Sequence, residues 1–397
     1  MEQLPFEQQP LGRQRERDQY EHPSEAGSVI ETRALLDELD EDALKDIFAR
    51  ELKKSGQEPK QILLNRFVPF ESIVVDGGKC INAGEYDPQN GEITIFSSSI
   101  ENSATNMSHA YVDDAQRTRL KALLQSIGTG YLFTEKGRAL KDFADYISAY
   151  RTYDPKTLQD ILFKIEVTHV IIHEELHALT DHVGQEIRRR DEEDDTEEYI
   201  GNKLIGVSNQ YSYRREGGGE VTFENSFLEF DGLNEGLTEL IARRLTQEYL
   251  KRVAVEGVNS KDINMFVAQA EAGAYPREQW VCELLTLLYS VVSEVPEVVI
   301  LDAMTRTYLS GESPILPPEF RTAVREQAPD IDQPVYDLLY ELECSISTNR
   351  FDKEADAEAV SAFDKFIKIL PESKQGQFNE GLALLSEKYK ICREMAA

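Results

Sequence analysis

The sequence predicts an α+β fold, with a small antiparallel sheet and one long helix in an N-terminal lobe and a mostly helical C-terminal lobe. Short runs of alternating polarity between about residues 62 and 100 are typical of strands. Apolar residues recur at helical spacing at about 32–55, and most of the chain after about 231 also has a helical pattern. With 397 residues, 41% of them hydrophobic, the chain is long enough to bury a substantial core in two lobes.

Five parts are expected along the chain. They are a disordered tail (1–30), an N-terminal lobe with the sheet and the long helix (31–183), an insertion with an acidic loop and a hairpin (184–230), a helical C-terminal lobe (231–350) and a helical appendage (351–397). The tail is rich in Gln, Glu and Arg and nearly free of aliphatic residues, a composition that does not support a packed core. A further helix, with a break near Gly128, is expected at about 113–150.

The predicted sheet consists of short strands joined by turns. Its strands are Ser72–Val75, Cys80–Tyr86 and Glu92–Phe96. A turn is expected between the last two strands, because Asp87–Gly91 reads Asp-Pro-Gln-Asn-Gly. Ile93–Phe96 is the candidate for an edge strand, and an ordinary structural hairpin is an equally good interpretation of the same residues.

Charge and composition exclude some classes of function. The formal net charge is −30, and nucleic-acid binding needs clustered Lys and Arg instead. No apolar run approaches the roughly 20 residues that cross a bilayer, so no membrane association is expected. The first residues show no pattern of a secretory signal, and the four cysteines include no C-x-x-C pair. We therefore expect a cytoplasmic protein with reduced thiols.

One stretch of the long helix has the spacing of a metal site. Asp154 and Pro155 are good start signals for this helix, which is expected to run to about Val183. His173 and His177 stand four residues apart, so both imidazoles lie on one face, one turn apart. Glu174 follows the first histidine and completes the pattern H-E-x-x-H, whose mechanics are those of a zinc-dependent hydrolase.

The faces of the helix agree with a buried site. The two histidines share one arc with Asp181, whereas apolar residues such as Ile171 and Leu176 occupy the opposite side. Glu175 falls within the apolar arc, and the sequence offers no physical account of it.

A catalytic zinc ion usually has three protein ligands and one open position. The chain contains six histidines. His182 lies on a different face from His177. His169 lies too far along the axis to share a metal ion comfortably, so it is expected to be a core histidine or one that supports a ligand rather than a ligand itself. The better third ligand is Glu235, in a helix expected at about 233–253, and Glu239 one turn later could accept a hydrogen bond from a ligand histidine. Two solvent-facing glutamates on an amphipathic helix are the alternative interpretation.

Two segments resemble the paired motifs of one enzyme family. His173–Asp181 reads HEELHALTD and Asn234–Glu239 reads NEGLTE, which is similar to the H-E-x-x-H and N-E-x-x-x-D motifs of thermolysin-like gluzincins. The resemblance implies a zincin-like fold with the cleft between the lobes. It also implies that His173, His177 and Glu235 bind Zn²⁺, that Glu174 is the general base and acid, and that Glu239 supports a ligand histidine.

The sequence departs from this family in two places. Glu239 stands where the family has Asp, and a long insertion separates His177 from Glu235. We expect that insertion to line or cover the cleft. The tyrosine or histidine that donates to the transition state in the family has no motif here, and three tyrosines are candidates that a role in the core would equally explain: Tyr275, Tyr289 and Tyr308.

The function expected from this pattern is hydrolysis of peptide bonds in a peptide or protein substrate. In zinc peptidases an edge strand pairs with the substrate backbone, and Ile93–Phe96 is the candidate. One alternative is a non-catalytic protein on a zincin scaffold, in which the metal is structural or lost. A second alternative is an acidic helical interaction protein without a metal ion. The sequence does not indicate the oligomeric state.

Overall fold

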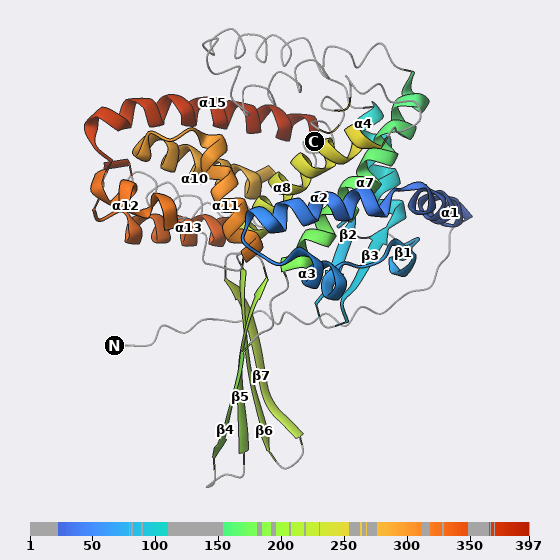
Figure 1. Ribbon diagram of the computed structural model, residues 1–397, viewed down its shortest axis with the longest axis horizontal. Helices are drawn as coiled ribbons and strands as arrows, with labels where there is room; N and C mark the ends of the chain where they lie inside the picture. Colours follow the sequence, from blue (N-terminus) through green and yellow to red (C-terminus); the bar gives the residue numbers. More distant parts are fainter. Residues whose placement is uncertain are drawn as a thin grey trace.

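The described part of the chain is mostly helical and contains two separate sheets. The computed structural model describes residues 23–109, 154–180, 185–253, 276–310, 318–347 and 370–396, apart from short gaps at 79, 81, 89, 192–195, 206–207, 218–219, 230 and 328, together with the single residues 263, 267, 365, 367 and 368. Within these residues, a mixed three-stranded sheet lies among helices, and an antiparallel four-stranded sheet projects away from them (Figure 1).

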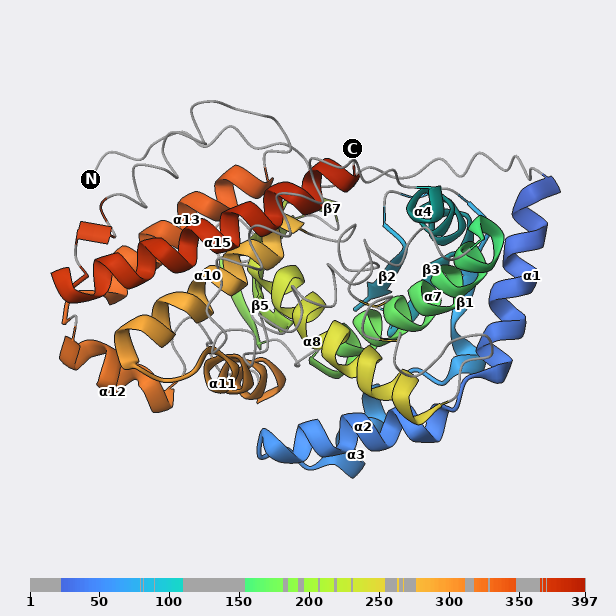
Figure 2. The same ribbon diagram turned by 90° about the horizontal axis from the view of Figure 1, so that it is seen from above.

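The N-terminal lobe consists of the small sheet, the helices around it and the long helix α7. Its elements are α1 (Pro23–Glu38), α2 (Glu41–Lys54), α3 (Pro59–Arg66), the 3-10 turn η1 (Phe70–Ser72), β1 (Val74–Asp76), β2 (Gly84–Asp87), β3 (Glu92–Phe96), α4 (Ser97–His109) and α7 (Pro155–Thr180). Helix α7 contacts α4 and the strands β2 and β3. The helix with the metal motif is therefore packed directly on the small sheet (Figure 2).

The start of the chain differs in part from the expectation. Helix α1 begins at Pro23, so the predicted disordered tail is wrong for residues 23–30, and its earlier part lies outside the described residues. Residues 32–55, which were expected to be helical, belong to two helices, α1 and α2. The break comes at Asp40, whose side chain accepts a hydrogen bond of 2.9 Å from the amide of Ala43 and so caps α2.

The small sheet has the strand order β1-β3-β2. Strand β3 is antiparallel to β2 but parallel to β1, so the sheet is mixed and the prediction of an antiparallel sheet is wrong in that part. Strand β3 also lies between its neighbours, so Ile93–Phe96 is not an edge strand. The edge next to α7 is β2 instead. The turn before β3 is confirmed, with the amide of Gly91 bonded to the carbonyl of Asp87 at 2.8 Å.

Helix α7 begins where its start signals predicted. The carboxylate of Asp154 accepts hydrogen bonds from the amides of Lys156 (3.2 Å) and Thr157 (3.1 Å), which satisfies two amides that the first turn leaves without helical partners. The helix extends to Thr180, and the residues directly after it, 181–184, lie outside the described part. The helix predicted at about 113–150 lies outside it as well.

The C-terminal lobe is helical, as predicted. Its elements are α8 (Asp231–Arg252), α10 (Pro276–Ser293), α11 (Glu297–Ser310), α12 (Pro318–Gln327), α13 (Asp332–Ser347) and α15 (Glu372–Ala396). Helix α15 falls in the expected appendage (351–397), but it packs along α10 and buries Phe378 fully. It is therefore part of this lobe rather than a separate unit (Figures 1 and 2).

The insertion between α7 and α8 is a sheet. Strands β4 (Gln185–Asp191), β5 (Thr196–Ile205), β6 (Ser208–Gly217) and β7 (Glu220–Glu229) pair in sequence order, each antiparallel to the next. The acidic loop expected at 186–198 is thus mostly strand, and the predicted hairpin forms the second half of a meander. The strands pair with one another and project away from the helices, but β5 contacts α7 and β6 contacts α8 (Figure 1). The expectation that the insertion lines or covers the cleft stays a prediction.

The two lobes share one hydrophobic core. Buried apolar side chains from the sheet, from α7 and α8 and from the C-terminal helices form one continuous cluster. Among the described residues, no single helix combines the length and apolar composition needed to cross a membrane, although α10 and α11 reach that composition together across a bend of 119°. Helices α7 and α8 are in direct contact inside the core.

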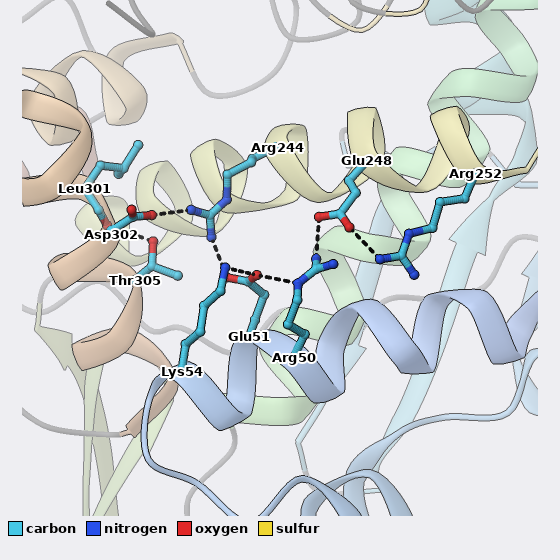
Figure 3. Close-up of polar contacts among 9 residues, drawn as sticks. All are labelled: Arg50, Glu51, Lys54, Arg244, Glu248, Arg252, Leu301, Asp302 and Thr305. Carbon is cyan, nitrogen blue, oxygen red and sulfur yellow. Dashed lines mark hydrogen bonds and ion pairs between the residues drawn. The ribbon is translucent and has the colours of Figure 1, made fainter.

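An ion-pair network joins α2 to the C-terminal lobe (Figure 3). Its centre is Glu51, which is 5% exposed and accepts a hydrogen bond of 2.9 Å from Arg244 of α8. The same arginine donates to Asp302 of α11 at 2.6 Å. Arg50 also bridges from α2 to Glu248 of α8. Networks of partly buried charges hold their geometry better than isolated surface pairs, so this network links α2, α8 and α11.

Close packing between α8 and α10 requires a glycine directly after Glu235. A Cβ atom added to Gly236 would lie 2.3 Å from the carbonyl oxygen of Glu278. That oxygen belongs to the backbone of α10 and cannot move without moving the helix. Helix α8 therefore approaches α10 at a distance that only glycine allows.

We predict that Gly236→Ala lowers the free energy of unfolding by about 1–3 kcal/mol, because the added methyl group overpacks this contact. The matched control is Gly376→Ala in α15, where an added Cβ would meet no atom within 4 Å. The control should be neutral or should stabilise the helix by up to about 1 kcal/mol. Chemical denaturation of both variants measures the difference, and equal stability of the two would contradict the packing argument.

Candidate metal centre

Two antiparallel helices, α7 and α8, hold the candidate metal centre. Its side chains recur one turn apart on both helices. They are His169, His173 and His177 on α7, and Glu235 and Glu239 on α8. Later residues of α7 contact earlier residues of α8, so the two helices run in opposite directions and their side chains interleave as a ladder. Within the described residues, two overlapping groups of this ladder could hold a metal ion.

The first group has the geometry of a metal site. The Nε2 atoms of His173 and His177 lie 3.1 Å apart, and the carboxylate oxygens of Glu235 lie 3.2 Å and 3.3 Å from them. Ligands of a tetrahedral zinc ion, each at about 2.0–2.1 Å from the metal, are roughly 3.3 Å from one another. Each histidine faces a different oxygen of Glu235, and the three side chains lie close enough together that they could hold one metal ion.

Glu239 lies behind this group rather than in it. Its Oε2 atom is 3.0 Å from Nδ1 of His173, the ring nitrogen that faces away from His177. In the neutral form of His173, this contact holds the ring proton on Nδ1 and leaves Nε2 available to a metal ion. Glu239 is 1% exposed, so this contact is shielded from water.

The second group consists of His169, His173 and Glu239. Here Nε2 of His169 lies 2.7 Å from Oε1 of Glu239, closer than two ligands of one tetrahedral metal ion. Distances of 2.7 Å and 3.0 Å to the two oxygens of one carboxylate are those of hydrogen bonds. The second group can supply ligand atoms, but its distances fit hydrogen bonding better.

The charges of the ladder compensate one another. Burial raises the pKa of Glu235, but the nearby imidazoles of His177 and His173 outweigh it and hold that pKa far below its ordinary value. Burial acts on Glu239 in the same way, and His169 and His173 lower its pKa to about 2. Burial lowers the pKa of His173, whereas Glu235 and Glu239 raise it well above 6.5. The site therefore favours ionised carboxylates facing cationic partners.

Glu174 lies beside the first group and against strand β2. It is 7% exposed, and burial raises its pKa. The charges of His173 and His177 oppose this shift, so its carboxylate lies within electrostatic reach of both histidines. A Cβ added to Gly84 would lie 2.8 Å from Oε1 of Glu174 and 2.5 Å from Val170. Glycine thus brings the backbone of the edge strand β2 next to this carboxylate.

Tyr308 of α11 joins the two site helices at the end next to His177. Its hydroxyl lies 2.8 Å from Oγ1 of Thr238 and 3.4 Å from Oγ1 of Thr180. Thr180 follows His177 by three residues, and Thr238 follows Glu235 by three. Tyr308 is fully buried, and burial raises the pKa of its hydroxyl far above the ordinary value. These contacts favour a positioning role over donation to a substrate.

Glu175, the residue that the sequence left without an account, faces away from the site. It is fully buried, and its Oε2 atom accepts a hydrogen bond of 3.3 Å from the amide of Val68. Its Oε1 atom has no partner among the described residues. Burial raises the pKa of this carboxyl well above the ordinary value, which favours its neutral form, and its contact with Val68 holds the segment before η1.

The structure brings together all five residues that the sequence singled out, and it adds others. His169 and Tyr308, for which the sequence left more than one role open, lie at the site, and so does Gly84, which the sequence did not indicate. The spacing of the sequence does indicate that His169 belongs to the site. It precedes His173 by one helical turn, just as Glu239 follows Glu235 by one turn. Two other earlier candidates, His182 and Tyr275, lie outside the described residues.

Comparisons with known proteins do not identify a relative. The chain matches no protein-family model, and searches of curated proteins and of solved structures find no match either. The interpretation of the site therefore rests on its own geometry.

Another buried carboxyl, Glu166, provides a test of the electrostatics around the ladder. Burial and the charge of Glu239 raise its pKa to about 8, and a hydrogen bond with Ser103 opposes the shift. Because this value lies above the ordinary 4.5, the folded protein binds more protons than the unfolded chain between these two pH values. The contribution of Glu166 to stability therefore falls as pH rises through this window.

We predict that Glu166→Gln removes this dependence, since glutamine is a neutral residue of similar shape. Relative to the variant, the wild type should lose stability from about pH 5 to pH 8, by at most about 1.4 kcal/mol per pH unit. Denaturant unfolding of both proteins at several pH values measures the difference. A difference in stability that stays constant with pH would show that Glu166 is ionised in the folded protein.

Proposed function

We propose that this protein is a zinc-dependent metallopeptidase. The observation that carries the proposal is the triangle of side chains His173, His177 and Glu235, beside the carboxylate of Glu174. The two Nε2 atoms are 3.1 Å apart, and each lies 3.2 to 3.3 Å from one of the two oxygens of Glu235. Two imidazoles and one carboxylate on neighbouring helices are a ligand set that zinc hydrolases use. The resemblance of the two sequence motifs to thermolysin-like gluzincins supports the same conclusion.

The choice of zinc rests on the chemistry of the ligands. Imidazole nitrogen suits zinc and other late transition metals, whereas magnesium and calcium favour sites made entirely of oxygen ligands. When bound, a zinc ion supplies a Lewis acid that polarises a carbonyl group and lowers the pKa of water toward about 7. Three protein ligands leave the fourth tetrahedral position for water or substrate.

In this proposal Glu174 transfers the proton. Its carboxylate accepts a proton from the attacking water and returns it to the leaving amine as the peptide bond breaks. Its pKa, raised by burial, favours proton uptake, and the adjacent positive charges keep the ionised form accessible. The other residues position it: Gly84 allows the close approach of β2, and Glu239 orients the ring of His173.

The proposed substrate is a peptide or an unfolded protein segment. Gly84 brings the backbone of β2 next to Glu174, so this strand lies beside the proposed proton acceptor.

The proposal includes a cytoplasmic location. Cys80 and Cys282 carry thiols rather than disulfides, which agrees with a reducing compartment. The net charge of −30 argues against nucleic acid as a partner. It is compatible with a soluble enzyme that acts on protein segments.

The neighbouring residues Glu174 and Glu175 provide a matched test. We predict that Glu174→Gln keeps the zinc content of the wild type but reduces cleavage of an unstructured protein such as casein by about 10²- to 10⁴-fold, because the proton acceptor is lost. Glu175→Gln should retain both zinc and activity, since glutamine replaces a neutral carboxylic acid on the other side of the helix. Zinc analysis and a proteolysis assay on the same preparations measure both effects.

The outcomes of this test separate the alternatives. Full proteolysis by Glu174→Gln at wild-type zinc content would exclude Glu174 as the general base. Stoichiometric zinc in the wild type without any hydrolysis would favour a binding protein with a structural metal ion. A wild type without zinc would favour the acidic interaction protein.

A further inference from the structure

His169 is a buried histidine that the proposed zinc ligand set does not use. It is 4% exposed, yet both of its ring nitrogens have partners. Nδ1 lies 3.2 Å from Oγ1 of Thr246, and Nε2 lies 2.7 Å from Oε1 of Glu239. The ring therefore connects α7 to α8 through two contacts.

The hydrogen-bond directions around His169 follow from the groups involved. Thr246 donates its one hydroxyl proton to the carbonyl of Ala242, at 2.8 Å. Its oxygen must then accept from Nδ1–H of His169, which fixes the orientation of the ring. The contact between Nε2 and Glu239 is short enough to require a proton between the two atoms, whichever of them carries it.

This arrangement defines the position of Glu239. One carboxylate oxygen is held by His169 at 2.7 Å, and the other faces Nδ1 of His173 at 3.0 Å. A glutamate side chain has one more rotatable bond than an aspartate, so it needs a second contact to be held in one position. His169 supplies that second contact inside the core.

We propose that His169 is a positioning residue for the metal centre: it holds the carboxylate of Glu239, which in turn orients the ring of His173 for metal binding. The inference rests on the zinc site of the proposed function. It extends the chain of contacts from the metal ligands to a third side chain and to Thr246. It also explains how a glutamate can act at position 239, where the similar family has an aspartate.

The inference is tested by zinc affinity, measured by competition with a chromophoric chelator. His169→Ala should weaken zinc binding by about 10- to 100-fold, the usual effect of losing a residue that orients a ligand. His169→Gln should restore most of the affinity, because its amide group can still donate to Glu239. Ile165→Ala, which truncates a fully buried residue one turn earlier on α7, is the control for general loss of stability.

Four results would overturn the inference. They are unchanged zinc affinity in His169→Ala, no recovery in His169→Gln, an equal loss in Ile165→Ala, and a second zinc ion in the wild type that His169→Ala loses. The last result would make His169 a ligand. None of these measurements depends on hydrolysis. A wild type that binds zinc without cleaving peptides would therefore contradict the proposed function but not the positioning role of His169.

The d–d absorption spectrum of the cobalt-substituted protein gives a second measurement of that role. A spectrum that changes in His169→Ala and returns to the wild-type form in His169→Gln would support it.

Discussion

The structure of the site depends on a ladder of imidazole–carboxylate contacts between α7 and α8. Five ionisable side chains lie along this interface and are mostly buried. Each histidine has a glutamate oxygen, and each glutamate a histidine nitrogen, within 3.3 Å. Burial of such groups is costly unless each one is paired. Pairing along the ladder therefore fixes which turn of α7 faces which turn of α8, and it brings His173, His177 and Glu235 together.

Packing around the ladder restricts how far the two helices can move. Helix α7 lies on the small sheet, whereas α8 packs closely on α10 at Gly236. Tyr308 joins the helices at one end, and the network around Glu51 attaches α2 to α8 and α11. The ligands thus come from elements of different lobes, and their geometry depends on the shared core as much as on the metal motif.

The sequence predicted the local features of this site better than the long-range ones. The start of α7 at Asp154 and the four-residue spacing of His173 and His177 follow from helix geometry. The order of the strands does not follow from local pattern, because β1 and β3 pair in parallel across a long connection. The partner of His169 could not be predicted for a similar reason: it is Glu239, which lies on another helix.

The central claim is that the triangle on α7 and α8 binds zinc through two imidazoles and one carboxylate. X-ray absorption at the zinc edge, on purified protein with one equivalent of zinc, tests it most directly. The account predicts four nitrogen or oxygen ligands at about 2.0–2.1 Å with the scattering pattern of two imidazoles. In Glu235→Ala, bound zinc should decrease sharply. Sulfur ligands at about 2.3 Å, a third imidazole, or no retained zinc would contradict the account.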